Sequence, residues 1–389
     1  MGERVVVGMS GGVDSALAAA LLVERGYDVL GVYMRNWTAD LPGFTCPWAA
    51  DLADAERVAV GLGIDLEVWD YEAEYKREVV DHLVDCYQHG ITPNPDVICN
   101  EKIKFGLFAE RALSRGADYI ATGHYARTVP GTEVVPGTQV VPGTDRVPGT
   151  SGQMVPGTDR VPGTSGSTGR LLRAADEHKD QTYFLWRVPG TVLSRTLFPI
   201  GDIPDKGTVR EMARERGIEV AGKKDSTGIC FIGDIGIRQF LLSQLDSQPG
   251  DIIDHETGER VGRHDGAFLY TIGQRRGLGI GGGPVRYVVR TDTKAGIVYV
   301  TSDRECPLLW MRELHLRDTH WIAGHAPRPG HYEIRTRHTR ALVGAMVEHG
   351  QGATAHLVLD RREPAIAPGQ SVVVYDGLEC LGGGILERC

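Results

Sequence analysis

Residues 8–15 read Gly-Met-Ser-Gly-Gly-Val-Asp-Ser, directly after the apolar run 4–7 and directly before the apolar run 16–22. Glycine allows a tight turn from a strand into a helix because it lacks the Cβ that restricts the backbone. The first amides of such a helix are unpaired and its dipole is positive there, so this turn is typical of a phosphate-binding site. The loop ends in Val-Asp-Ser instead of Gly-Lys-Ser/Thr, which excludes the common nucleotide-binding loop.

Short apolar runs alternate with amphipathic stretches over the first 122 residues. The expected strands are 4–7, 29–33, 65–69 and 118–122, and the expected helices are 16–25, 52–62, 75–89 and 104–115. This order predicts an α/β fold with a parallel, doubly wound sheet that has helices on both faces. Ligands bind such sheets at the carboxyl ends of the strands, where the glycine-rich turn lies.

A run of Val-Pro-Gly-Thr units interrupts this pattern over residues 129–169, and one more unit occupies residues 188–191. Pro-Gly pairs favour tight turns, and the segment has almost no large side chains to bury. We therefore predict a mobile insertion in a surface loop for residues 129–169.

The remainder of the chain changes character twice. Helical stretches are expected at 208–216 and 237–244, a glycine-rich region with short strands follows, and from Tyr287 onward the pattern is purely β. Short strands separated by Gly and Pro turns predict a small antiparallel β-barrel. The predicted domains are residues 1–205, a central domain of residues 206–286, and a barrel domain of residues 287–389.

Composition narrows the possible compartments and chemistries. The chain has 389 residues, a formal net charge of −9, and seven cysteines without any Cys-x-x-Cys pair. We expect no membrane segment and no export signal, and therefore a cytoplasmic location. No metal site is expected, because the cysteines lack the spacing of a zinc site or a disulfide framework. Chemistry by cysteine must then come from isolated thiols.

Two segments place a cysteine among residues that favour reactivity. Residues 92–100 read Thr-Pro-Asn-Pro-Asp-Val-Ile-Cys-Asn, which predicts a rigid loop holding Asp96 and Cys99. Residues 224–233 carry Cys230 two residues after a glycine, and the lysine pair at residues 223 and 224 favours its thiolate. The alternative for each cysteine is a small buried hydrophobic residue.

Taken together, these motifs identify the chain as similar to the tRNA-specific 2-thiouridylases of the ATP pyrophosphatase (PP-loop) superfamily. The resemblance covers nearly the whole chain, and its motifs lie at residues 8–15, 92–100, 121–125, 179–185, 225–233, 264–267, 270–279 and 380–385. It implies an N-terminal domain of the adenine nucleotide alpha hydrolase type. It also implies that the central domain binds tRNA.

The activity implied by the resemblance has two stages. ATP, accompanied transiently by Mg²⁺, adenylates the 2-carbonyl oxygen of the tRNA wobble uridine, and sulfur then displaces AMP to give 2-thiouridine and pyrophosphate. Cys230 carries the persulfide sulfur received from a donor protein, Cys99 closes a disulfide with Cys230, and Asp96 acts as general acid or base. Release of sulfide before attack on the base uses the same groups, and both orders stay open.

The resemblance also implies three sets of contact residues. The ATP-binding set is Gly8, Met9, Ser10, Gly11, Gly12, Val13, Asp14, Ser15, Met34 and Gly123. The set around the flipped target base is Asn94, Pro95 and Asp96. The set that touches tRNA is His124, Lys179, Asp180, Gln181, Arg335, Thr336 and Gln370, to which Gln274, Arg275 and Arg276 add phosphate contacts.

Two other functions stay open beside sulfur transfer. One is another ATP pyrophosphatase, such as an amidating ligase of small molecules, which needs no pair of distant thiols. The other is a nucleotide-dependent RNA-binding protein without turnover.

The insertion lies between His124 and Lys179, so we expect it to loop away from any bound tRNA.

Overall fold

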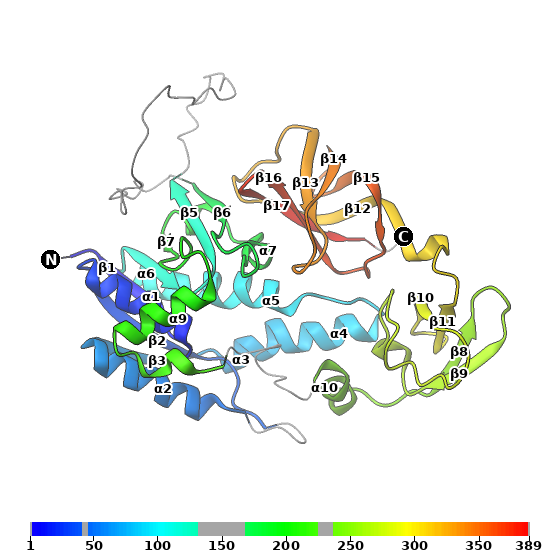
Figure 1. Ribbon diagram of the computed structural model, residues 1–389, viewed down its shortest axis with the longest axis horizontal. Helices are drawn as coiled ribbons and strands as arrows, with labels where there is room; N and C mark the ends of the chain where they lie inside the picture. The colour runs from blue at the N-terminus through cyan, green and yellow to red at the C-terminus, as the bar shows by residue number, and fades with distance from the viewer. Residues whose placement is uncertain (1, 41–45, 131–167, 225–235, 388–389) are drawn as a thin grey trace.

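The computed structural model describes residues 2–40, 46–130, 168–224 and 236–387. Figure 1 shows three parts: an α/β domain at the left, a β-barrel at the upper right, and a smaller domain at the lower right. Cys230 and most of the predicted insertion lie outside the described residues. Within the described residues, no helix is long and apolar enough to cross a membrane.

The N-terminal domain contains a five-stranded parallel sheet with the strand order β3-β2-β1-β4-β7. Val5 and Val7 pack into one hydrophobic cluster and Val6 into another, because successive side chains point to opposite faces of a strand. The α/β prediction is therefore confirmed. The strands are β1 (Arg4–Gly8), β2 (Asp28–Arg35), β3 (Asp65–Asp70), β4 (Tyr119–Thr122) and β7 (Thr196–Leu197).

Helices cover both faces of this sheet. The cluster with Val5 and Val7 includes residues of α1 (Val13–Glu24), α2 (Trp48–Leu62) and α9 (Lys206–Glu215). The opposite cluster takes residues from two long helical stretches in which α-helical and π-helical segments follow one another. These are α3 (Glu72–Tyr75), η1 (Lys76–Asp81) and α4 (His82–Gln88), then α5 (Pro95–Ile98), η2 (Cys99–Phe108) and α6 (Ala109–Ser114).

A hairpin carries the insertion. Strand β5 (Ala126–Pro130) pairs antiparallel with β6 (Gly169–Arg173), and Val129 and Gly169 are themselves ladder residues. The expected insertion boundaries at 129 and 169 were therefore too wide, because local Pro-Gly content hid the ends of two strands. After α7 (Thr182–Leu185), the separate repeat unit at 188–191 leads into a short helix, α8 (Gly190–Leu193), with Pro189 as its N-cap.

The smaller domain combines α10 (Gly236–Gln244) with a four-stranded sheet of order β10-β11-β8-β9. Its strands are β8 (Gly250–Asp254), β9 (Arg260–His264), β10 (Tyr287–Asp292) and β11 (Ile297–Thr301). We expected the barrel to begin at residue 287, but β11 pairs with β8, so that boundary would cut this sheet. We propose a boundary between β11 and β12 instead.

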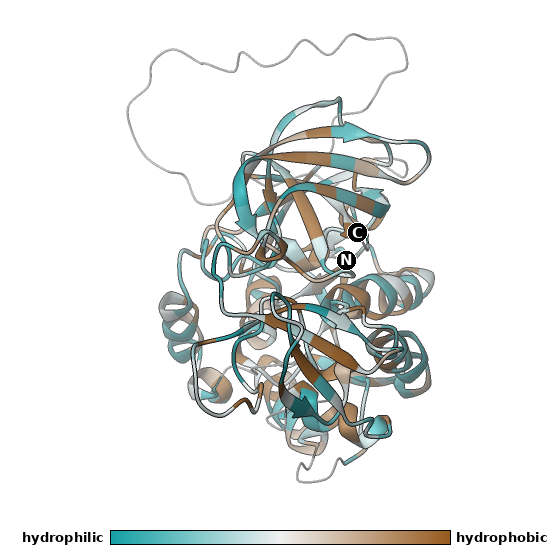
Figure 2. Ribbon diagram, turned by 90° about the vertical axis from the view of Figure 1, so that its right-hand side faces the viewer, coloured by the Kyte–Doolittle hydropathy of each residue, from teal (hydrophilic) through white to brown (hydrophobic). Residues whose placement is uncertain are grey.

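Six antiparallel strands form the C-terminal barrel, which closes where β12 pairs with β17. The predicted barrel is thereby confirmed. Strand β17 also pairs with β6, so the barrel is joined to the N-terminal domain by a shared sheet. In Figure 2 hydrophobic residues, in brown, lie mainly on strands and inward helix faces. The strands are β12 (Trp310–Trp321), β13 (Gly330–Arg335), β14 (Val343–His349), β15 (Ala355–Pro364), β16 (Ser371–Asp376) and β17 (Glu379–Leu386).

Candidate active site

The glycine-rich turn leads into α1 without a side chain capping the helix. Gly12 is the N-cap and makes no side-chain hydrogen bond, so the first amides of α1 remain available to an anion. Gly11 has φ +71°, and a Cβ there would lie 2.1 Å from the Asp51 carbonyl oxygen. The Ser15 hydroxyl accepts a hydrogen bond from the Ser10 amide at 3.1 Å and donates one to the Gly12 carbonyl. The turn is therefore a compact anion cradle.

Other predicted nucleotide residues gather at the same end of the sheet. A Cβ on Gly8 would lie 2.9 Å from Met34 Cε, and one on Gly123 would lie 2.6 Å from the Ser15 amide nitrogen. The side chains of Met9 and Val13 are buried in the core. We expected ligand contacts from them as from their neighbours. In this structure their side chains pack into the hydrophobic cluster that contains Val5 and Val7, and the Met9 amide donates to the Val32 carbonyl at 2.8 Å.

Asp14 is held by two residues that our sequence reasoning missed as partners. Lys206 Nζ lies 2.7 Å from each carboxylate oxygen, and the Tyr125 hydroxyl donates to Oδ1 at 2.7 Å. Tyr125 belongs to a motif that we had noted, whereas nothing near Lys206 in the sequence points to Asp14. The carboxylate is thus oriented by groups from two segments distant from it along the chain.

Lys223 stabilises the same turn from outside. Its ammonium group donates to the Gly11 carbonyl at 3.1 Å and to Asp51 at 2.7 Å, and it also pairs with Asp54. Burial lowers the pKa of Lys223, but the two carboxylates outweigh burial and hold it above its ordinary value. We expected this lysine to favour the Cys230 thiolate. Cys230 lies outside the described residues, so that expectation stays a prediction; among the described residues the Lys223 ammonium bonds to the nucleotide side of the site.

Asp96 and Cys99 lie on a helix. The rigid loop that we predicted from the two prolines is wrong, because Pro95 occupies the first position of α5 and Asn94 caps it, accepting from the Val97 amide at 3.4 Å. An N-cap asparagine followed by proline is a known helix-start signal. Residues three apart on a helix share a face, so the carboxyl and the thiol are neighbours. Cys99 is 6% exposed.

The environment of Asp96 alters its acidity. Burial raises its pKa above the ordinary value of 3.8, although the charges of Lys104 and His338 act in the opposite direction. A raised pKa brings the carboxyl closer to the range in which it can both accept and give a proton. Lys104 and His338 were absent from our predicted site. Their proximity to Asp96 depends on the fold, and sequence spacing gives no signal for His338.

His338 belongs to the segment after β13 and reaches from the barrel to the N-terminal domain. Its Nε2 lies 2.8 Å from the Asp180 carbonyl oxygen, so this nitrogen carries the donated proton. Its ring lies 4.6 Å from that of Phe184. The contact fixes the imidazole beside the helix of Asp96 and Cys99.

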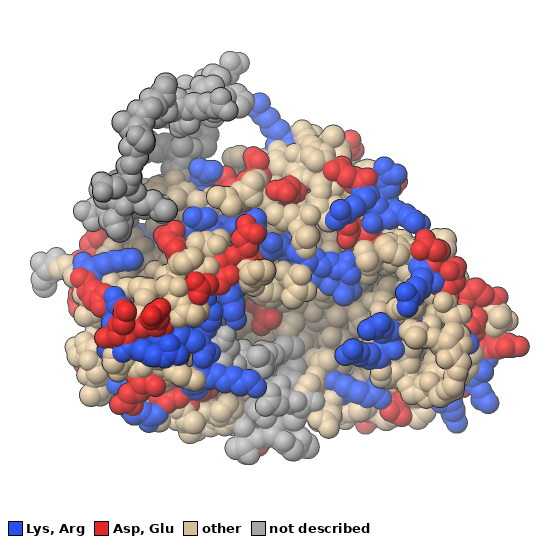
Figure 3. Space-filling model, viewed as in Figure 1, with Lys and Arg blue, Asp and Glu red and all other residues tan. Residues whose placement is uncertain are grey.

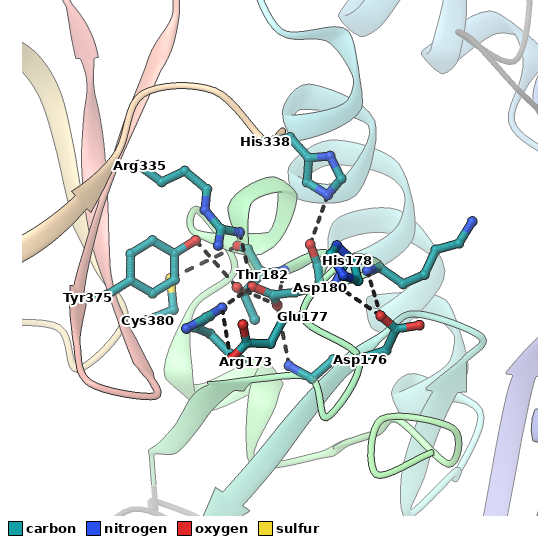
Figure 4. Close-up of polar contacts among 12 residues, drawn as sticks. Arg173, Asp176, Glu177, His178, Asp180, Thr182, Arg335, His338, Tyr375 and Cys380 are labelled. Carbon is teal, nitrogen blue, oxygen red and sulfur yellow. Dashed lines mark hydrogen bonds and ion pairs between the residues drawn. The ribbon is translucent and has the colours of Figure 1, made fainter. Parts of the chain in front are cut away.

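Several residues predicted to touch tRNA are buried. Figure 4 shows Arg173 and Arg335 converging on Asp180, whose side chain is fully buried. The carboxylate is 3.2 Å from Arg173 Nε and 3.1 Å from Arg335 Nη1, and it also accepts from the Thr182 hydroxyl at 2.8 Å. Thr336 is 5% exposed. Asp180 and Arg335 bond to each other and Thr336 is buried, so in this structure these side chains lie inside the protein instead of facing RNA.

His124 is buried as well. Its Nδ1 lies 2.8 Å from the Thr122 hydroxyl, and its ring packs against Phe105 and Phe198. Burial, with the nearby Lys104 charge, holds the pKa of His124 well below its ordinary value. The ring is therefore neutral at pH 7, which does not suit a phosphate contact.

Two glutamines from the predicted RNA set also bond internally. Gln370 Nε2 donates to the Thr92 carbonyl at 2.7 Å, which fastens the barrel to the chain just before Asn94. Gln181 Oε1 accepts from the Tyr125 amide at 2.9 Å. Lys179 is partly exposed, whereas Arg275 and Arg276 are exposed. Exposure thus divides the predicted RNA contacts into internal and outward groups.

One short segment connects the two halves of the site. Gln181 bonds to Tyr125, whose hydroxyl reaches Asp14 in the cradle. At the other end, Asn100 Nδ2 donates to the Phe184 carbonyl at 3.1 Å. Residues 180–184 therefore hold the cradle and the helix of Cys99 in a defined relationship.

The surface around this site is hollowed. Figure 3 shows a depression near the centre of this face, with blue basic side chains on several sides of it. The formal net charge of the whole chain is −9, so this cluster of basic side chains has the opposite sign to the net charge. Such a distribution suits a polyanionic ligand.

Three family models match consecutive parts of the chain. They are described as a tRNA methyl transferase HUP domain over residues 3–234, a tRNA methyl transferase PRC-barrel domain over residues 238–302, and an aminomethyltransferase beta-barrel domain over residues 311–386. Their limits follow the three parts of the fold.

Full-length relatives match as well. Proteins named tRNA-specific 2-thiouridylase MnmA are 42% identical in Bordetella petrii over 99% of this chain and 96% of the relative. The matches in Ralstonia pickettii and Geobacillus thermodenitrificans are also 42% identical, over 99% of this chain and 96% and 95% of those relatives. A solved NMN synthetase from Francisella tularensis is 18% identical, over 31% of this chain and 44% of that one, with a TM-score of 0.22.

Proposed function

Because the chain belongs to the family of tRNA-specific 2-thiouridylases, we propose how its residues divide the work of transferring sulfur to a tRNA uridine. The chain is a tRNA-uridine 2-sulfurtransferase. Two stages are needed, since a carbonyl oxygen is a poor leaving group. Activation precedes displacement, and each stage uses a different half of the site.

The cradle performs the activation. The unpaired amides at the start of α1 bind the departing pyrophosphate of ATP, with Gly8, Met34 and Gly123 shaping the space beside it. Magnesium bound with ATP would neutralise phosphate charge, and Asp14 offers the carboxylate oxygens for it. Lys206 and Tyr125 orient this carboxylate. The uridine 2-oxygen takes the adenylyl group and becomes a good leaving group.

The helix beginning at Pro95 performs the displacement. The terminal sulfur of a persulfide on Cys230 bonds to C2 of the base, the Cys99 thiolate attacks the Cys230 sulfur, and a Cys99–Cys230 disulfide forms as AMP leaves. Asp96 moves the proton, and Asn94 and Pro95 border the base. In the other order, sulfide leaves Cys230 first and then attacks C2. A reductant must reopen the disulfide after either route.

Recognition of tRNA is assigned to exposed and partly exposed groups. Gln274, Arg275, Arg276 and Lys179 contact phosphates, whereas Asp180, Arg335, Thr336, His124, Gln181 and Gln370 act indirectly by fixing the segments around the base. A persulfide-carrying protein supplies the sulfur. We place the reaction in the cytoplasm, where thiols stay reduced between turnovers.

The main support for this function is the segment of residues 180–184, which connects the two halves of the site. It is hydrogen-bonded to the cradle through Tyr125 and to the Cys99 helix through Asn100. A two-stage reaction on one base needs both halves within reach of the same carbonyl carbon, because correct positioning supplies much of the rate.

The test uses purified chain, unmodified tRNA, Mg-ATP and a persulfide donor, with 2-thiouridine measured by mass spectrometry and pyrophosphate by a coupled assay. Cys99→Ser and Cys230→Ser should each abolish 2-thiouridine. Cys306→Ser, at a buried cysteine in the cluster beside β10, is the matched control and should keep the activity. Pyrophosphate release without 2-thiouridine in the parent chain, unchanged in Cys230→Ser, would favour an amidating ligase, and 2-thiouridine formed by Cys230→Ser would refute the role given to Cys230. A parent chain that binds tRNA and ATP without product would favour a binding protein.

A further inference from the structure

Two histidines face each other on the outer surface of the barrel. His315 on β12 is directly opposite His356 on β15 in the antiparallel ladder. Their rings are stacked, with centroids 4.7 Å apart and an interplanar angle of 21°. Leu314, Leu316 and Leu357, their neighbours along the strands, point into the barrel core. Alternation therefore places both imidazoles on the outward face.

A carboxylate completes the group. Glu313 lies two residues before His315 on β12, so it points to the same face, and its Oε2 is 3.4 Å from His356 Nε2. One possible ligand atom from each of the three side chains lies within 4.8 Å of the others. Ligands held roughly 2.0 to 2.2 Å from a tetrahedral zinc ion are separated by about 3.4 Å. Small rotations of these partly exposed side chains reach that spacing.

His356 has an unsatisfied ring nitrogen. Its Nε2 is shielded from solvent and makes no hydrogen bond within the described residues. Apart from the Glu313 contact this buried nitrogen lacks a hydrogen bond, which costs stability, and a metal ion bound to both side chains would remove this cost. Glu348 on β14 lies opposite His356 on its other side and is exposed, so a second carboxylate or a water molecule can take the fourth position.

We propose that Glu313, His315 and His356 form a binding site for one divalent transition-metal ion of the zinc class. Two imidazoles with a carboxylate suit Zn²⁺, Co²⁺ or Ni²⁺, whereas Mg²⁺ and Ca²⁺ prefer oxygen ligands alone. The ion cross-links β12 and β15. The site shares no residue with the cradle or with the helix of Cys99, so it is independent of the sulfur-transfer chemistry.

Titration of the full chain with Co²⁺ tests this site, with Zn²⁺ as competitor. We expect one Co²⁺ per chain, visible d–d absorption, and no thiolate-to-cobalt charge-transfer band from this ion, because the ligands are nitrogen and oxygen. His315→Ala and His356→Ala should each weaken affinity on the order of a hundredfold, and Glu313→Gln should weaken it less. Binding should also weaken on acidification, since protons compete for the imidazoles.

The matched control is His331→Ala. His331 is exposed on β13 and pairs with Asp360 at 2.9 Å, so among the described residues it offers a carboxylate and an imidazole without the second histidine. This variant should keep the parent affinity. His315→Gln separates loss of a ligand from misfolding, because glutamine is close to histidine in size but is a poor zinc ligand. Unchanged affinity in both histidine variants, or a thiolate band on the tightest ion, would overturn the proposal.

Discussion

Asp180 and Arg335 form a buried ion pair across the junction between the N-terminal domain and the barrel, with 3.1 Å between Oδ2 and Nη1. Arg173, on β6, approaches the same carboxylate oxygen at 3.2 Å. One carboxylate therefore offsets two buried guanidinium groups that come from different domains. The segment that bears it also lies between the nucleotide cradle and the Cys99 helix, so domain connection and site geometry depend on the same residue.

Replacement of Asp180 by asparagine should be strongly destabilising. Arg335 and Arg173 would lose the buried carboxylate that both contact, and Arg173 would keep only the exposed Glu177 at 3.9 Å, which costs about 3 to 5 kcal/mol of unfolding free energy. Urea denaturation measures the loss. Asp360→Asn is the control, because Asp360 pairs with His331 on the surface and should change stability by about 1 kcal/mol or less. Equal effects of the two substitutions would show that burial does not matter here.

Gly11→Ala should weaken the binding of ATP. Gly11 has a positive φ, and its Cβ would collide with the Asp51 carbonyl oxygen, so the cradle must open. We expect ATP affinity to fall on the order of a hundredfold by calorimetry. Gly61→Ala is the control: Gly61 lies in α2 with nothing near its Cβ position, and alanine there should stabilise the helix by about 0.5 to 1 kcal/mol. Unchanged affinity in Gly11→Ala would refute the cradle.

Asp96→Asn should raise the stability of the protein at pH 7 while it abolishes thiolation. Burial raises its folded-state pKa above the ordinary value of 3.8, so the folded protein holds the proton more tightly than the unfolded chain. The stability contributed by the protonated form is complete below pH 3.8 and is lost as pH rises through the folded pKa. Asp96→Asn should therefore be more stable than the parent at pH 7 and equal to it in strong acid, while thiolation disappears.

The control for this pH dependence has the opposite sign. The Arg35 hydrogen bond holds the pKa of Asp70 below its ordinary value, so Asp70→Asn should lose stability at pH 7 and match the parent in acid. Denaturation curves at several pH values measure both differences. A less stable Asp96→Asn at pH 7 would mean that the bonds of the charged carboxylate outweigh its desolvation.

Lys206→Met should slow the first stage of the reaction, in which ATP activates the uridine. Lys206 holds both oxygens of Asp14 at 2.7 Å, and its loss frees the carboxylate to rotate. We expect kcat/KM for ATP to fall by about ten- to a hundredfold, with KM for tRNA unchanged. Lys102→Met, at an exposed lysine paired with Glu101, should behave as the parent. A defect confined to KM for tRNA would argue for a phosphate contact instead.

The local features of the fold could be predicted from the sequence. The turn at residues 8–15, the alternation of strands and helices, and the run of C-terminal β-strands all follow from patterns within short windows, because period and glycine content are local properties. The helix start at Pro95 was also encoded locally, by Asn94 as cap, and was missed because two prolines were interpreted as a loop.

The tertiary structure alone decided which polar residues are internal. Asp180, Arg335 and Gln370 look like surface groups in the sequence, yet each bonds to a segment distant along the chain. The same holds for β10 and β11, which join β8 in the central sheet, and for Lys206 at Asp14. Burial and strand pairing depend on contacts between residues far apart in sequence, and a local pattern carries no information about those partners.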